Sequence, residues 1–140
     1  MGNDHMTGLR IAALVAAPVL LIPLLVACQQ ELPVAVTAER GQVVFSVPAT
    51  NPPCVNEIRV APASAPKDSV WAVDSSDSKH CHTRFAYGAL PAGFTQIVAA
   101  EPLKSGRLYL VAIERPGAMG ITFFEPGKAD GSIERDPPAN

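Results

Sequence analysis

The amino-acid sequence predicts an all-β protein, a small antiparallel sandwich of about seven strands that follows a cleaved export signal. Short segments rich in β-branched and aromatic residues recur at spacings near ten residues, as in small sandwiches. Of the 14 prolines, only Pro18 and Pro23 precede Cys28, and most of the others lie between these segments, where proline favours turns. Two further cysteines can form a disulfide, which small exported domains often need for stability.

The expected strands follow the local residue pattern. Gln42–Val47 is rich in β-branched and aromatic residues, which favour strands. Glu57–Ala61 and Thr83–Tyr87 alternate polar and apolar residues, the pattern of a half-buried strand. The polar loop Asp74–Lys79 contains Asp and Ser, which favour turns. The full set of expected strands is 42–47, 57–61, 70–73, 83–87, 94–99, 107–114 and 120–124.

An apolar run near the N-terminus is typical of an export signal. Arg10 supplies the positive charge, Ile11–Val26 the apolar run and Ala27 the small residue before a cleavage site. A membrane-spanning helix needs about 20 apolar residues. This run is shorter, and Pro18 and Pro23 interrupt it, each removing a helical hydrogen bond. We therefore expect a cleaved signal rather than a permanent span.

The four residues that end this run, Leu25-Val26-Ala27-Cys28, resemble the lipobox of bacterial lipoproteins. The resemblance implies that the signal is removed before Cys28 and that the Cys28 thiol carries a diacylglycerol. Stable anchoring needs more than one acyl chain, which such a modification provides. Gln29 rather than Asp follows the cysteine, which by the same resemblance implies sorting to the outer membrane, facing the periplasm. The alternative is an ordinary secretory signal that leaves a free cysteine.

The predicted signal, lipid attachment and strands divide the chain into four segments. Residues 1–27 are the signal peptide, 28–40 a lipidated tether, 41–125 the β-sandwich domain and 126–140 a flexible tail. The length fits a single domain. The formal net charge is −2 and no basic stripe is present, so the sequence gives nucleic-acid binding no electrostatic support.

Cys54 and Cys81 remain as an even pair once Cys28 is lipidated. Export carries the chain into an oxidising compartment, where such a pair is expected to form a disulfide.

The most diagnostic stretch of the exported part is Leu103-Lys104-Ser105-Gly106-Arg107-Leu108-Tyr109. It resembles the Leu-x-x-Gly-x-x-Tyr tyrosine corner of immunoglobulin-like and fibronectin-like β-sandwiches. The resemblance implies that the Tyr109 hydroxyl bonds to backbone upstream, that Gly106 permits a tight turn and that Leu103 points into the core. The cysteines depart from this family, because Cys54 precedes the second expected strand and Cys81 lies in a mid-chain loop. The alternative is another small antiparallel sandwich or barrel.

The most distinctive cluster of candidate metal ligands in the sequence is His80-Cys81-His82. Imidazole and thiolate suit both zinc and copper, and Asp74 and Asp77 lie close in sequence. On a strand, however, both histidines would share one face and Cys81 would lie on the other. A disulfide would also remove the thiolate. We expect no cofactor, and the alternative function is a periplasmic metal-binding lipoprotein that uses His80 and His82.

Enzymatic sites find little support in the sequence. The serines, Asp77 and His80 of residues 75–80 are the types a hydrolytic triad needs, but they crowd into one loop without a Gly-x-Ser-x-Gly elbow. Glu57, Glu101 and Glu114 are candidate glycosidase carboxylates without a supporting pattern. We expect that the protein is not an enzyme.

The expected function is that of a non-enzymatic cell-envelope lipoprotein. A β-sandwich anchored through Cys28 would bind another envelope protein, in a secretion or surface assembly or as an immunity protein. Exposed strand edges and loops of sandwiches suit such binding. The aromatic residues are expected to fill the core rather than to line a carbohydrate or peptide groove: Trp71, Phe85, Tyr87 and Phe94.

Overall fold

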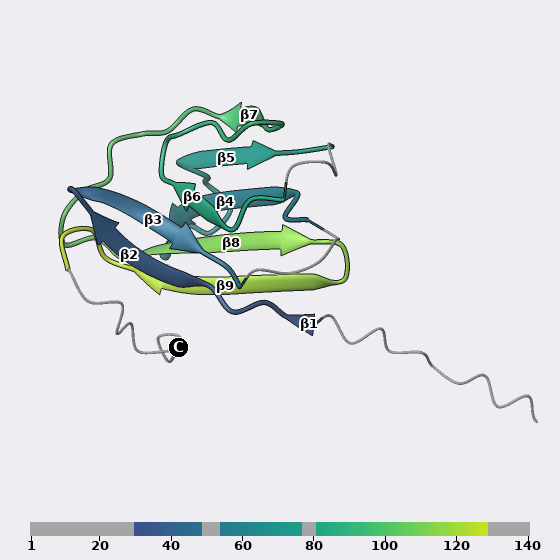
Figure 1. Cartoon of the computed structure of the whole chain (residues 1–140). Coiled ribbons are helices and arrows are strands. Elements are labelled where there is room, and N and C mark those ends of the chain that lie inside the picture. Colours follow the sequence, from purple (N-terminus) through teal and green to yellow (C-terminus); the bar gives the residue numbers. More distant parts are fainter. Residues whose placement is uncertain (1–29, 49–53, 77–80, 129–140) are drawn as a thin grey trace, which may run out of the picture.

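A computed structural model shows two β-sheets that pack as layers and describes residues 30–48, 54–76 and 81–128 (Figure 1). The larger sheet has the strand order β1-β9-β8-β4-β5-β7 and the smaller one β2-β3-β6. The strands of the described residues are β1 (Gln30–Glu31), β2 (Ala35–Glu39), β3 (Gln42–Ser46), β4 (Glu57–Pro62), β5 (Trp71–Asp74), β6 (Arg84–Ala86), β7 (Thr95–Val98), β8 (Tyr109–Arg115) and β9 (Ala118–Phe124). The predicted fold class, a small all-β sandwich, is confirmed.

The apolar run of residues 11–26, Cys28 and the tail beyond Lys128 lie outside the described residues. Within the described ranges, no helix is long and apolar enough to cross a membrane.

Strands β8 and β9 form the central hairpin of the larger sheet. They pair over their whole length, from Tyr109 opposite Phe124 to Arg115 opposite Ala118. The turn between them contains Gly117, whose φ of 83° lies in the left-handed region that glycine adopts without a Cβ penalty. β4 pairs with β8 on the other side, and all pairings of both sheets are antiparallel except that of β1 with β9.

The seven expected strands correspond to β3 to β9, and each boundary lies within two residues of its expected place. The segment 28–40 was expected to be a tether, and this expectation is wrong for residues 30–39. They contribute β1 and β2, so the described residues contain nine strands and the sandwich already includes residues 30–39. The reason is an alternating pattern in which Leu32, Val34 and Val36 pack against the core and the residues between them are exposed.

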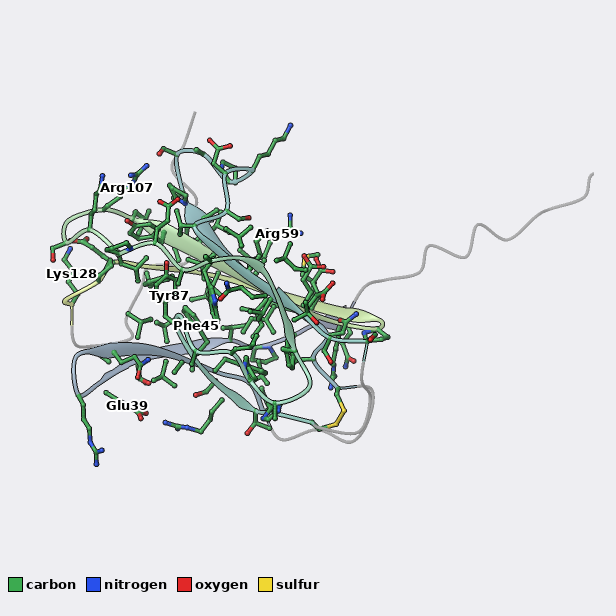
Figure 2. All side chains as sticks on the ribbon, turned by 90° about the horizontal axis from the view of Figure 1, so that it is seen from above. Glu39, Phe45, Arg59, Tyr87, Arg107 and Lys128 are labelled. Carbon is green, nitrogen blue, oxygen red and sulfur yellow. A yellow bond between two sulfur atoms is a disulfide. The ribbon has the colours of Figure 1, made fainter. Side chains whose placement is uncertain are left out.

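The core lies between the two sheets and is built around aromatic side chains. Phe45 of the smaller sheet and Trp71 of the larger one are both fully buried, with ring centroids 6.3 Å apart. Phe45 also meets Phe124 edge to face at 5.4 Å, so one side chain connects both sheets. Figure 2 shows Phe45 and Tyr87 between the layers, whereas Arg59 and Glu39 lie on opposite outer sides. The expectation that the aromatic residues fill the core is confirmed for Trp71, Phe85 and Phe94, which are buried, and for Tyr87, which packs against the core.

The predicted Cys54–Cys81 disulfide is present, with the two Cα atoms 4.8 Å apart (Figure 2). Cys54 lies in the connection from β3 to β4 and Cys81 in that from β5 to β6. Both connections pass between the sheets, so the bond ties two crossovers together. With a sequence separation of 27, the loop closed by the bond contributes roughly 3–4 kcal/mol in the chain-entropy model.

The N-terminal segment of the fold crosses from one sheet to the other. Gln30 and Leu32 donate backbone hydrogen bonds to Gly117 and Met119, both at 2.9 Å, which seats β1 on the edge of the larger sheet. After Leu32 the chain leaves this edge, and from Ala35 it pairs with β3 in the smaller sheet. In Figure 1 this path runs along β9 and then passes over to the other layer as β2.

The crossing depends on Gly120 in the middle of β9. A Cβ atom built on Gly120 would overlap the carbonyl oxygen of Leu32 and would lie 2.6 Å from Cγ2 of Val34. Residues 32–35, which pass from one sheet to the other, are called the crossing segment. Any other residue at position 120 would push this segment away from the sheet, since a backbone carbonyl cannot move aside as a flexible side chain can.

The substitution Gly120→Ala is expected to lower the free energy of unfolding by about 1–3 kcal/mol, the usual cost of overpacking a fitted interior. Chemical denaturation followed by the fluorescence of Trp71, the only tryptophan, measures this change. Ile121→Val, on the exposed side of the same strand, is the control and should change stability by less than about 0.5 kcal/mol. Equal stabilities of wild type and Gly120→Ala would contradict the close approach of the crossing segment.

Candidate binding groove

A groove of about 1020 Å³ follows the crossing segment on the surface of the sandwich. Its walls come from three stretches that are distant in sequence: the crossing segment, the end of β3 and the second half of β9. The lining residues are Glu31, Leu32, Pro33, Val34, Ala35, Val36, Thr37, Ser46, Val47, Pro48, Ile121, Thr122 and Phe123. Most of these side chains are apolar, and the groove carries one charged side chain, Glu31, at its end.

The exposed large hydrophobic side chain of the groove is Ile121, at 55% of its possible exposure. Scattered exposed apolar residues are normal on a protein surface. Ile121 is different because it shares the outer face of β9 with Met119 and Phe123, both half-buried. On the neighbouring strand, Leu110 lies opposite Phe123 and Ala112 opposite Ile121. The groove therefore continues into an apolar strip on the outer face of the larger sheet.

Among the residues that the structure describes, none pairs with the second half of β9 along this groove, so its backbone edge is open there. β1 pairs with β9 only at Ala118 and Met119, whereas β8 covers the opposite edge completely. In a strand, the N–H and C=O of one residue point to the same edge, and successive residues alternate. Gly117 and Met119 accept hydrogen bonds from the β1 side. Ile121 and Phe123 therefore direct their main-chain groups to that same side, beyond the point where β1 has ended.

A second open edge borders the same groove. β2 is the terminal strand of the smaller sheet, and among the described strands it pairs only with β3. Its other edge, over Ala35–Glu39, faces away from β3. The two sheets thus each present an unpaired strand edge on either side of the crossing segment.

The floor of the groove is fixed by a side-chain hydrogen bond. The Thr122 hydroxyl donates to the Val34 carbonyl oxygen at 3.1 Å. The two residues are 88 positions apart in the sequence. After Leu32 the crossing segment forms no backbone ladder with β9, and this side-chain bond holds the segment to β9 instead. Together with the Gly120 contact, it holds the crossing segment against the inner side of β9 and leaves the outer edge of β9 uncovered.

A shallower hollow of about 500 Å³ lies on the outer face of the smaller sheet. An ion pair between Arg84 and Glu39 crosses it above Val44. Both charged side chains are about half exposed, so the pair contributes little to stability. Four of its six lining residues are charged or polar, so its walls differ from the apolar walls of the groove.

The predicted metal ligands are not brought together as a metal site in the described residues. Cys81 is committed to the disulfide, and His80 lies outside the described residues. The His82 ring packs edge to face on Phe85 and Phe94, and its Nε2 lies 2.9 Å from the Ala92 carbonyl oxygen. The described ranges contain no group of three or more His, Cys, Asp or Glu residues placed to hold a metal ion. Metal binding through His80 and His82 stays a prediction.

The candidate catalytic residues are distributed over separate parts of the fold. Glu57 lies opposite Glu114 on β8 and also opposite Asp74 on β5, all on the outer face of the larger sheet. Glu57 also forms an exposed ion pair with Arg59. Glu101 lies elsewhere, in the segment before β8. Of the serine cluster, the Ser75 hydroxyl donates to the Gly93 carbonyl oxygen at 2.7 Å, and Asp77, Ser78 and His80 lie outside the described residues.

The tyrosine-corner residues form a closed turn at the start of β8. The backbone N–H of Lys104 donates to the Tyr109 hydroxyl at 3.0 Å, which is the bond that the pattern anticipates. Gly106 has a φ of 73°, and Leu103 packs against the core. The Tyr109 ring is buried and stacks on Phe124 at 5.8 Å. This turn fixes the start of the hairpin whose second strand borders the groove.

The hydroxyl of a second tyrosine, Tyr87, also bonds to the backbone. The Tyr87 hydroxyl donates to the Glu101 carbonyl oxygen at 2.6 Å and lies 3.3 Å from that of Val70. Burial, with smaller contributions from nearby Tyr109 and Glu101, raises the pKa of Tyr87 from 10.0 to about 12. Loss of the proton would place a phenolate beside two carbonyl oxygens.

The raised pKa of Tyr87 predicts how stability depends on alkaline pH. The folded state holds this proton more tightly than the unfolded state, so its contribution is complete below about pH 10 and is lost between about pH 10 and 12. Denaturation of wild type and Tyr87→Phe over this interval is the measurement, and the variant should show a smaller decline. Tyr109→Phe retains Tyr87 and removes only one of the smaller contributions to its pKa, so most of the decline should remain. Identical declines of wild type and Tyr87→Phe would contradict the assignment.

Comparison with protein-family models, with curated proteins and with solved structures finds no match. The groove therefore has to be interpreted from its own geometry.

The sequence indicated none of the groove as a site. The sequence predicts a tether over residues 28–40 and only a strand over residues 120–124. One signal was available, because Leu32, Val34 and Val36 alternate with polar or small residues and so indicate a strand. The pairing of this segment with a strand almost 90 residues away carries no local signal.

Proposed function

We propose that this chain is a non-enzymatic, lipid-anchored β-sandwich that binds another protein of the cell envelope through the groove. One observation carries the proposal: an apolar groove is bordered by unpaired strand edges of both sheets. Unpaired edges offer main-chain hydrogen bonds to a second polypeptide. Apolar walls exclude water from such contacts and add burial energy.

The anchor that the lipobox implies would place the groove at the membrane surface. The groove begins at Glu31, three residues after Cys28, and three extended residues span at most about 11 Å. A partner in the groove would therefore lie within reach of the same membrane. For this reason we propose an envelope protein as the partner, at the outer membrane and facing the periplasm.

The arrangement of strands supports membership of the immunoglobulin-like or fibronectin-like sandwiches as part of this proposal. β2, β3 and β6 form one sheet, and the closing hairpin β8–β9 pairs with β4 in the other. The Tyr109 bond to Lys104 lies at the position of a tyrosine corner. The disulfide differs from the family pattern, since it joins two connections between sheets rather than two facing strands.

Photo-crosslinking in native membranes tests the proposed function. The full chain with p-benzoylphenylalanine in place of Ile121 is expected to crosslink to a defined envelope protein. Ile97, on the edge strand β7, is the matched control, since it is also isoleucine and is exposed to 58% against 55% for Ile121. The Ile97 position should give no such product. In the same membranes, Cys28→Ser should move the chain from the membrane fraction to the soluble fraction.

Three results would contradict the proposal. Absence of a specific product at position 121, or an equal product at position 97, would remove the groove as the binding site. Retention of the Cys28→Ser variant in the membrane fraction would remove the lipid anchor.

A further inference from the structure

We propose that the groove binds its partner by strand addition: an extended segment of the partner pairs with the open edge of β9 from Gly120 to Phe124. This inference rests on the proposed function and adds the chemical nature of the bound segment. It assigns the recognition to main-chain hydrogen bonds supported by apolar side chains.

The first argument is the unused hydrogen-bonding capacity of β9. Ile121 and Phe123 direct their N–H and C=O groups to the edge that β1 has left, and these groups recur every second residue at the repeat of a strand. Only another extended chain supplies donors and acceptors at the same repeat. A helix satisfies its own backbone groups internally and cannot pair with this edge.

The second argument is that the edge already accepts a strand. β1 pairs with β9 in parallel at Ala118 and Met119, and the bonds from Gln30 and Leu32 are both 2.9 Å long. A strand that is added at Ile121 and Phe123 would continue the line of β1 along the same edge. The added segment therefore requires no pairing geometry that the molecule does not already contain.

The third argument is the chemistry of the walls. Residues of an added strand would alternate between two sides. Those on the inner side would meet Val34 and Val36, and those on the outer side would lie beside Ile121 and Phe123. Both sides are apolar, so a segment of β-branched residues without charge fits the groove. β-Branched residues also favour the extended conformation that pairing needs.

The other open edges of the described fold lack this combination. β7 exposes Ile97, but its pairing with β5 is irregular at Ala72 and Val73, and it lines neither the groove nor the hollow described above. The outer edge of β6 carries the exposed Arg84, and charged residues discourage added strands. β2 also borders the groove, but four of its five residues are exposed and it ends in the charged Glu39. The β9 edge is therefore the one we choose for the added strand.

Substitutions at Ile121 separate strand addition from simple apolar contact. Ile121→Pro removes the outward N–H without removing a bond to β8, because the main-chain groups of Ile121 face the open edge. Ile121→Thr removes the same apolar side chain and retains the N–H, so it is the matched control. Thermal unfolding followed by Trp71 fluorescence establishes that both variants are folded.

The probe is a fluorescein-labelled peptide of alternating Val and Thr, about eight residues long, as a typical strand is. Its binding to the full chain in detergent is followed by fluorescence anisotropy. Wild type should bind it saturably, Ile121→Thr less than about tenfold more weakly, and Ile121→Pro at least about tenfold more weakly than Ile121→Thr, or 1.4 kcal/mol. The same peptide with proline in place of each valine should not bind.

Several outcomes would overturn strand addition. One is that wild type shows no saturable binding of the peptide up to about 1 mM. Another is that Ile121→Pro and Ile121→Thr weaken peptide binding equally. A wild-type dimer in sedimentation that Ile121→Pro converts to a monomer would instead assign the edge to a second copy of the chain. If the position-121 crosslink to an envelope protein persists in any of these cases, the proposed function stands and only strand addition fails.

Discussion

The close contact between Leu32 and Gly120 is the constraint on which the described structure most depends. It allows the N-terminal segment to begin on the larger sheet and to end on the smaller one. Because the segment leaves β9 after two paired residues, it closes one side of the core with Leu32 and Val34 and leaves the remaining edge of β9 uncovered. The same crossing thus completes the hydrophobic core and creates the groove.

The rest of the sandwich holds β9 in place for this role. Phe124 at its end packs against both Phe45 and Tyr109, and the Tyr109 hydroxyl is fixed by the Lys104 N–H. The disulfide limits how far the two crossovers at Cys54 and Cys81 can separate in the unfolded chain. The packing of Phe124, the turn closed by Tyr109 and the disulfide involve different parts of the chain. Each of them limits the relative movement of the two sheets that border the groove.

Most of the fold was predictable because its signals are local. β4 and β6 show alternation, β3 is rich in β-branched residues, and Cys54 and Cys81 form the one pair left after Cys28. A tether is predicted for the segment from Gln30 to Glu39 because it contains Pro33 and follows the stretch that resembles a lipobox, although its apolar residues alternate. The open edge of β9 could not be predicted, since it depends on where a segment almost 90 residues earlier leaves that edge. Parallel pairing of distant residues leaves no trace in local composition.

The most direct test of this account is to measure backbone amide hydrogen exchange along β9, residue by residue. The N–H groups of Gly120 and Thr122 face β8 and should exchange slowly, whereas those of Ile121 and Phe123 face the open edge and should exchange fast. The Leu32 N–H, which donates to Met119, should be protected as well. Uniformly slow exchange from Gly120 to Phe124 would mean that this edge is already paired, and it would contradict the groove as a site for an added strand.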